Sequence, residues 1–190
     1  MIPAVAQTLA KILAGGTSLI STEQIDFNHP GWRKNTGPGL NLYCYDLRAN
    51  SQVQQSQRQV ESSNTHQQPL ATRANSSTRW FDVSFLVSAW DYTALGEQRL
   101  LSEALMLLLH HHDLKEELLA LELRGYGNLP ITVSTVHPTE TAALWSALGV
   151  PLRPAVYVTM TVPFDRKYIP PSSELYFQGG VIDSDPLKAR

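Results

Sequence analysis

Residues 79–109, RWFDVSFLVSAWDYTALGEQRLLSEALMLLL, contain a strand pattern that passes directly into a helix pattern. Over residues 79–90 the side chains alternate between two sides, as in a β-strand, and many of them favour strands. One side is apolar: Phe81, Val83, Phe85, Val87 and Ala89. The other side is mixed: Trp80, Asp82, Ser84, Leu86, Ser88 and Trp90. We therefore expect a strand at the centre of the core.

After Asp91 and Thr93, which are both suitable helix caps, the spacing of the apolar residues changes from that of a strand to that of a helix. Apolar residues then recur at helical spacing, at Leu101, Ala104, Leu105 and Leu108, while Glu97, Arg99 and Glu103 fall on other faces. This pattern predicts a helix with one buried side.

The preceding chain predicts another helix and two strands. Residues 2–14 are amphipathic, and Gly15 and Gly16 end the pattern. We favour packing of this helix on the protein's own sheet over binding to a partner. Residues 22–28 form a weak strand pattern, whereas residues 40–48, LNLYCYDLR, are apolar on both faces and predict a central strand.

The following chain predicts more strands and a further helix. Residues 114–121 suggest a short helix or an edge segment, and residues 131–136 suggest a strand. A helix then opens at residues 137–140, buries Leu144, Trp145 and Leu148, and ends at Gly149. Residues 153–164 predict the last strand, in which Pro163 should end the ladder or mark an edge.

Together these elements predict one α/β (α+β) domain with a mixed, mostly antiparallel sheet of about four to five strands flanked by about three helices. The domain should cover residues 1–165, and residues 166–190 should form an extended C-terminal arm. The arm carries the side chains that we expect to bind a partner, Tyr168, Ile169, Leu175, Tyr176 and Phe177. Folding back on its own domain is the equal alternative. The ELYFQG sequence in the arm resembles a protease site of expression vectors, but the chain continues beyond it, and we treat it as native.

Residues 50–78 interrupt the strands with a segment rich in glutamine, serine and asparagine. The segment has too few apolar residues to fold alone, so it should be a long excursion from a hairpin. It is either a mobile loop or a loop that a neighbouring subunit orders.

The amino-acid composition argues against several classes of function. The formal charge of −2 and the pI near 6.3 give no basic surface for nucleic acid. The single cysteine, Cys44, excludes an intrachain disulfide and a cysteine-built zinc site. The N-terminus lacks a signal-peptide pattern, and no apolar run approaches the roughly 20 residues that span a bilayer. We therefore expect a soluble protein without membrane insertion.

No familiar catalytic or phosphate-binding motif occurs in the chain, and we expect neither an enzyme nor a cofactor. A metal-dependent hydrolase is the enzymatic alternative, with His110, His111, His112 or His137 as ligands. Consecutive histidines on a helix point about 100° apart, so they do not converge on one ion. His137 fits a helix cap better than a catalytic base.

The order of these features resembles the cap, or tail-terminator, proteins of phage-tail-like contractile injection systems. The similarity covers residues 1–165, and its most specific parts are residues 81–114 and 144–164. A glutamate-arginine-leucine-leucine helix start that is typical of the family is found here as Glu97, Arg99, Leu100 and Leu101.

The resemblance implies a ring-forming, non-enzymatic subunit, with six copies at the end of the tube and sheath distal to the baseplate. The partners implied are the tube and sheath proteins of the same particle. The particle would assemble in the cytoplasm and then be either released or attached to a membrane. A neck or baseplate connector of a similar particle is the alternative function.

Overall fold

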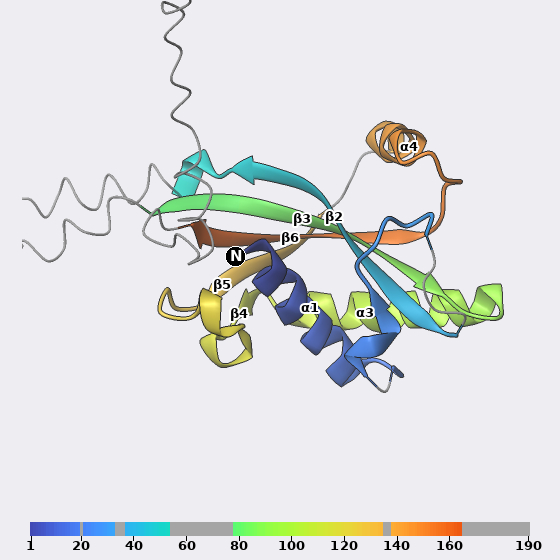
Figure 1. Ribbon diagram of the computed structural model, residues 1–190, viewed down its shortest axis with the longest axis horizontal. Helices are drawn as coiled ribbons and strands as arrows, with labels where there is room; N and C mark the ends of the chain where they lie inside the picture. Colours follow the sequence, from blue (N-terminus) through green and yellow to red (C-terminus); the bar gives the residue numbers. More distant parts are fainter. Residues whose placement is uncertain (20, 33–36, 54–77, 135–137, 165–190) are drawn as a thin grey trace, which may run out of the picture.

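The computed structural model describes residues 1–19, 21–32, 37–53, 78–134 and 138–164 of the chain (Figure 1). Three α-helices and six strands carry most of the described structure, in the order α1 (Ile2–Gly16), β1 (Ile25–Asp26), β2 (Gly39–Ala49), β3 (Arg79–Trp90), α3 (Ala94–His110), β4 (Asp113–Leu114), β5 (Leu129–Ser134), α4 (Pro138–Ala147) and β6 (Ala155–Phe164). Short 3₁₀ turns lie at Thr22–Gln24, Glu116–Leu118 and Leu121–Leu123.

The six strands form one mixed sheet in the order β1-β2-β3-β6-β5-β4. Only β1 and β2 pair in parallel, and every other pair is antiparallel. The predicted α/β class and the mostly antiparallel sheet are therefore confirmed. The weak strand predicted within residues 22–28 is found as the two-residue β1, and the sheet has one strand more than predicted because β4, with two residues, is too short to produce a periodic pattern.

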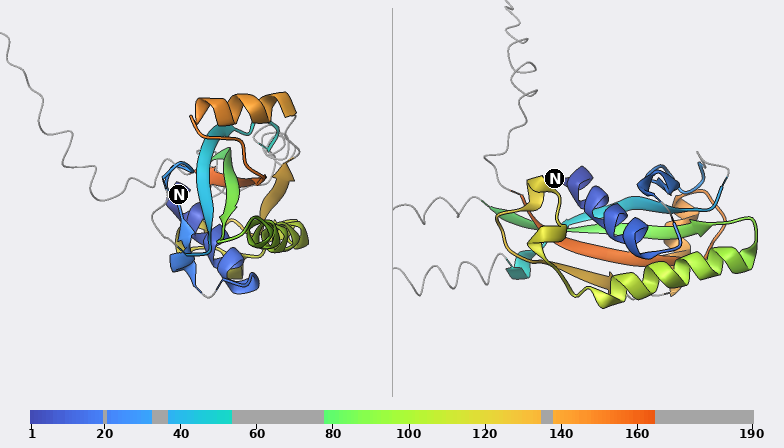
Figure 2. Two further views of the ribbon diagram at one scale, coloured as in Figure 1. Left: turned by 90° about the vertical axis from the view of Figure 1, so that its right-hand side faces the viewer. Right: turned by 90° about the horizontal axis from the view of Figure 1, so that it is seen from below.

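Helices α1 and α3 cover one face of the sheet and enclose the main core (Figure 2). The predicted apolar side of β3 faces this core, with Val83, Phe85 and Val87 fully buried. Thr93 caps α3 by accepting a hydrogen bond from the N–H of Gly96 at 3.0 Å. The buried side of α3 is rotated slightly from the predicted one, because Leu100 is buried and Leu101 is only half-buried.

Of the three α-helices described above, only α4 packs on the opposite face of the sheet, and it covers one end of that face (Figure 2). As predicted, the helix directs Trp145 inward, where the indole N–H donates to the hydroxyl of Tyr157 at 3.0 Å. Leu86 of β3 completes this second, smaller core. Gly149 ends the segment with a φ of 65°, which glycine adopts without strain.

Two predictions about the strands need correction. Strand β2 is not central, because its only neighbour besides β3 is β1, which pairs with Leu40 and Asn41 alone. Its start is buried because β1 and β3 flank Leu40 and Asn41 and the main core covers Leu40 and Leu42, whereas the rest of the strand is progressively more exposed. Of the two roles predicted for Pro163, the end of the ladder is wrong, because pairing with β3 continues to Phe164; the edge fits, because Pro163 lies beyond Met160, where the pairing with β5 ends.

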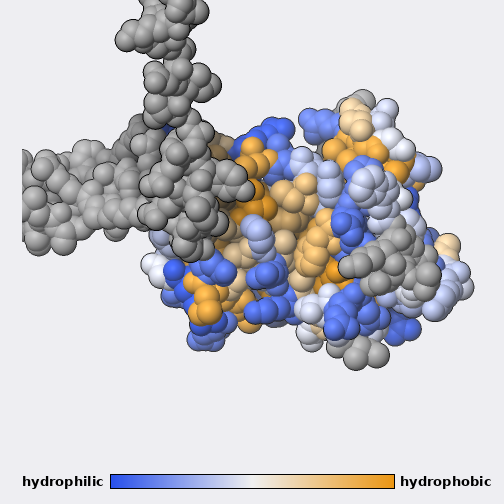
Figure 3. Space-filling view, viewed as in Figure 1, coloured by the Kyte–Doolittle hydropathy of each residue, from blue (hydrophilic) through white to orange (hydrophobic). Residues whose placement is uncertain are grey.

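The surface between α1 and α4 includes an apolar band over β2 (Figure 3). No described helix combines the length and the apolar character that crossing a bilayer requires. Most of the excursion, His137 and the whole C-terminal arm fall outside the described residues, so the predictions made for them stay predictions. Strands β2 and β3 are antiparallel neighbours, as expected for a hairpin that carries the excursion.

Candidate functional site

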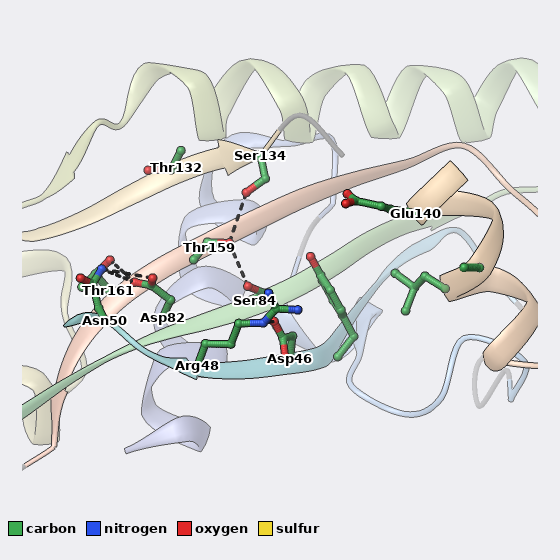
Figure 4. Close-up of a pocket in the computed structure, with 13 residues that line it drawn as sticks. Asp46, Arg48, Asn50, Asp82, Ser84, Thr132, Ser134, Glu140, Thr159 and Thr161 are labelled. Atoms are coloured by element: carbon green, nitrogen blue, oxygen red, sulfur yellow. Dashed lines mark hydrogen bonds and ion pairs between the residues drawn. The ribbon is translucent and has the colours of Figure 1, made fainter. Parts of the chain in front are cut away.

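A polar groove occupies the part of the second sheet face that α4 leaves uncovered (Figure 4). Its volume is about 850 Å³. The lining comes from four strands, from α4 and from the residue that follows β2: Tyr45, Asp46, Arg48, Asn50, Asp82, Ser84, Thr132, Ser134, Glu140, Ala143, Leu144, Thr159 and Thr161. We call this set the polar groove.

A β-bulge shapes one wall of the polar groove. The register of β2 against β3 shifts between Cys44 and Asp46, so Tyr45 is an additional residue. Without a bulge, neighbouring residues of a strand point to opposite faces. Here Tyr45 and Asp46 both line the groove. Burial raises the pKa of the Tyr45 phenol, which therefore stays protonated around neutral pH.

A chain of hydroxyl groups crosses the floor of the groove from β3 to β5. The oxygen atoms of Ser84 and Thr159 lie 2.9 Å apart, and those of Thr159 and Ser134 lie 3.2 Å apart (Figure 4). Ser84 and Thr159 are register partners in β3 and β6, and Ser134 of β5 lies diagonally from Thr159, two residues beyond its register partner Thr132. The hydroxyls thus satisfy each other on an uncovered sheet face.

Asp82 organises the end of the groove near the start of the excursion. It accepts the hydroxyl of Thr161 at 2.6 Å and the amide group of Asn50 at 3.0 and 3.1 Å (Figure 4). The other end of the Asn50 amide accepts the backbone N–H of Val53 at 3.0 Å. Asp82 therefore fixes the direction in which the chain leaves β2.

The charges of the groove are mostly acidic. Asp46, Asp82 and Glu140 contribute carboxylates, and the one arginine of the lining, Arg48, lies 2.6 Å from Asp46. Among the described residues the lining contains no histidine, cysteine or lysine, and the Asp82 carboxylate is already bound by the hydroxyl of Thr161 and the amide of Asn50. The described part of the groove is suited to polar contacts with another surface.

A second candidate surface lies at the opposite end of the sheet, where β2 and β6 begin and β3 ends. Large apolar side chains are strongly exposed there: Trp32 by 75%, Tyr92 by 78%, Leu95 by 78% and Leu152 by 64%. We call these four residues the apolar end. Exposed apolar groups that gather in one region of a soluble domain are typical of interaction sites.

Arg153 fixes the elements that carry the apolar end. Its guanidinium lies 3.5 Å from the centre of the Trp90 ring and 2.6 Å from a carboxylate oxygen of Glu97. It also donates to the carbonyl of Ala89 at 3.2 Å. The start of α3, the end of β3 and the segment before β6 are therefore held together, which keeps the apolar end in one arrangement.

The sequence-predicted site residues are not brought together by the described structure. Tyr168, Ile169, Leu175, Tyr176 and Phe177 lie outside it. The rings of His110 and His111 are 5.6 Å apart and nearly perpendicular, and no group of three potential ligands occurs among the described residues. Sequence reasoning placed Ser84 and Asp82 on the mixed side of β3, but it did not identify the polar groove that they line.

Two solved structures share the fold. The sheath/tube terminator of the PVC extracellular contractile injection system is 15% identical, with a TM-score of 0.57, and the match covers 87% of this chain and 56% of that chain. The tube-terminating cap of the anti-feeding prophage is 14% identical, with a TM-score of 0.52, and the match covers 86% and 53%. The chain therefore spans just over half the length of each.

A comparison with curated protein sequences found no match. Residues 4–177 match the family described as the Pvc16 N-terminal domain. This range includes every described element except the first residues of α1. The resemblance to cap proteins of contractile injection systems is thus confirmed, and the chain belongs to the Pvc16 N-terminal domain family.

Proposed function

We propose that the protein is a structural cap that terminates and stabilises the distal end of the inner tube and contractile sheath of a contractile injection system. One observation carries the proposal: the fold of almost the whole chain is that of two proteins described as a sheath/tube terminator and a tube-terminating cap. The family match over residues 4–177 supports the same conclusion from sequence.

A cap of this kind contacts tube and sheath proteins of its own particle and forms a closed ring of identical copies, with six as the proposed number. A ring satisfies the head-to-tail contacts of its subunits, whereas the end of a growing tube presents contacts that stay open until a different protein covers them. The apolar end and the polar groove supply two chemically different surfaces for these two kinds of contact.

We further propose that the arm residues Tyr168, Ile169, Leu175, Tyr176 and Phe177 contact a neighbouring subunit. The cap would act without catalysis, cofactor or metal, and would join the particle in the cytoplasm before the particle is released or attached to a membrane. The lining of the polar groove, in which hydroxyls bond to each other, supports a contact surface.

The test is electron microscopy of particles from cells that lack the gene, scored for sheath length and for the structure of the end distal to the baseplate. We expect particles without sheath or with variable sheath length, and recovery of uniform length when the gene is restored. Normal capped particles in the deletion strain would reject the cap and favour a connector elsewhere in the assembly.

The apolar end allows a sharper version of this experiment. Leu95→Ser and Met106→Ser remove apolar side chains of similar exposure, 78% and 72%, from opposite halves of α3. If the apolar end contacts the particle, Leu95→Ser should restore sheath length poorly in the deletion strain. Met106→Ser should restore it as well as the unaltered gene. Equal restoration would remove the apolar end from the proposal.

A further inference from the structure

Within the described part of the chain, one edge of strand β2 is unpaired over most of its length. On the side away from β3, the described strands pair with it only at Leu40 and Asn41. The remaining residues, Leu42–Ala49, form what we call the open edge. Eight residues of strand extend over about 26 Å and present backbone N–H and carbonyl groups in a row.

The residues of β2 become more exposed from its start to its end. Its first four residues are buried, the next four are half-buried and the last three are exposed. Leu47 is 44% exposed, although the register places it beside the fully buried Val83. The apolar band between α1 and α4 lies over this strand (Figure 3). Apolar surface therefore accompanies the unpaired backbone.

The two sides of the open edge differ in chemistry. Cys44 and Leu47 pair with Phe85 and Val83 of the main core, so they lie on the face that α1 covers. Asp46 and Arg48 line the polar groove on the other face. Because side chains of a strand alternate between faces, a strand added here would need apolar residues at every second position and polar residues between them.

The open edge also carries features that discourage unspecific pairing. Natural sheets protect their edges with bulges and charged side chains. Strand β2 has both, in the bulge at Tyr45 and in Arg48, whose side chain is 79% exposed. An edge with a bulge and an exposed charge should pair only with a strand that accommodates both.

We propose that the open edge of one copy binds residues 173–178, SELYFQ, of a second copy as an added strand. This rests on the proposed ring of identical subunits. In an extended segment, Leu175 and Phe177 would face the α1 side, and Glu174 and Tyr176 would face the groove side. Glu174 would then share the guanidinium of Arg48, whose side chain is 79% exposed, with Asp46, which lies 2.6 Å from it.

The position and length of the arm favour exchange between copies. The register pairs Phe164 with Arg79 and Ala49 with Phe81, so the arm leaves the sheet at the end where the open edge ends. The copy's own open edge lies about three strand spacings away, roughly 14 Å. Residues 165–172 include Pro170 and Pro171, which favour extended backbone, and they span up to roughly 25 Å. This maximal reach exceeds the distance to the copy's own edge, so the spacer is long enough for residues 173–178 to reach a second copy.

Disulfide trapping in isolated capped particles tests the exchange. Cys44→Ala removes the only cysteine of the chain. In that background, one tagged copy carries Leu47→Cys, and a second copy with a different tag carries Leu175→Cys or Phe177→Cys. Neighbouring strands bring their Cα atoms within disulfide range. We expect a disulfide that joins the two tags on mild oxidation.

Two controls test the geometry. Tyr176→Cys shares the segment with Phe177→Cys but should face the groove, so its yield with Leu47→Cys should be at least several-fold lower. Leu152→Cys, at the opposite end of the sheet, should give none with any arm variant. Equal yields for Tyr176→Cys and Phe177→Cys would overturn an added strand.

Failure of this inference is distinguishable from failure of the cap. Capped particles that contain both variants but show no disulfide joining the two tags would overturn the exchange and leave the cap intact. Variants that are absent from otherwise normal capped particles would overturn both.

Discussion

Gly39 begins β2 where the backbone passes close to the 3₁₀ turn before β1. A Cβ atom at this position would collide with the carbonyl oxygen of Gln24, which belongs to the backbone and cannot rotate away. A Cβ atom at Gly15, at the end of α1, would meet nothing. The two glycines thus have different reasons for being present.

Gly39→Ala should lower the free energy of unfolding by about 1–3 kcal/mol, because the turn must move to relieve the collision. Gly15→Ala is the matched control and should leave stability unchanged or raise it by up to about 1 kcal/mol. Urea denaturation of both variants measures the difference. A Gly39→Ala protein as stable as the unaltered one would contradict the close approach.

Glu103 ties α3 to the chain that follows α1. The backbone N–H of Ser18 donates to its carboxylate at 2.8 Å, and Arg99 lies at 3.1 Å. The N–H of Ser18, and then Arg99, lower the pKa of Glu103. A lowered pKa in the folded state stabilises the fold above the usual carboxyl pKa and loses this contribution as the pH falls through the lowered value.

The unaltered protein should therefore lose more stability than Glu103→Gln between neutral pH and about pH 3. The difference should stay within a fraction of a kcal/mol, roughly, because the Arg99 side chain is mostly exposed. Thermal unfolding across this range measures it. Parallel pH profiles would show that the Ser18 contact does not hold Glu103 ionised.

Cys44 lies half-buried on β2, and burial raises the pKa of its thiol. Because the thiolate is the reactive form, alkylation at about pH 8 should be slower in the folded protein than in the denatured chain. Iodoacetamide labelling followed by mass spectrometry measures both rates. Equal rates would indicate that the Cys44 thiol is fully accessible to the reagent in the folded protein.

At the level of single residues, sequence reasoning succeeded where one face of an element is uniformly apolar. Val83, Phe85 and Val87 are buried as predicted because the alternation of β3 is unbroken. Which of Leu100 and Leu101 is the more buried was less predictable, because two adjacent leucines do not determine which side of the helix faces the core.

Among the elements, α4 packs on the sheet through a small core that is separate from the main one. Trp145 and Leu86 pack against Tyr157, whose hydroxyl accepts the indole N–H of Trp145. The apolar residues of α4 predicted its inward side from sequence. The sheet face on which α4 packs was not predictable from sequence. Leu86 lies on the mixed side of β3, opposite the apolar side that fills the main core.

Tyr157→Phe should leave the indole N–H of Trp145 buried without an acceptor and lower the free energy of unfolding by about 1–3 kcal/mol. Hydrogen exchange of the α4 backbone should accelerate, while exchange of β3 should change only as far as global stability does. Unchanged exchange in α4 would show that this bond does not anchor the helix.

The strands, too, were predictable only where one face is uniformly apolar. The sequence predicted β3 and β6 within a few residues, since both are long and apolar on one face. It misplaced β2 because apolar residues on both faces arise from helix and loop cover as well as from neighbouring strands. The polar groove was not predictable, since its members come from four strands and α4, which only the tertiary fold brings together.

For the whole molecule, the described fold has one heavily covered sheet face and one largely polar, partly covered face, with an apolar end. A subunit that must contact both a tube and a sheath needs several separate surfaces. The proposed cap function would place these surfaces at one position in a particle, the end distal to the baseplate.

The most direct measurement is the position of the protein on isolated particles, determined by immunogold electron microscopy with an antibody against this chain. The account predicts gold at a single end, distal to the baseplate, on sheathed particles. Gold at the baseplate or along the sheath would contradict it.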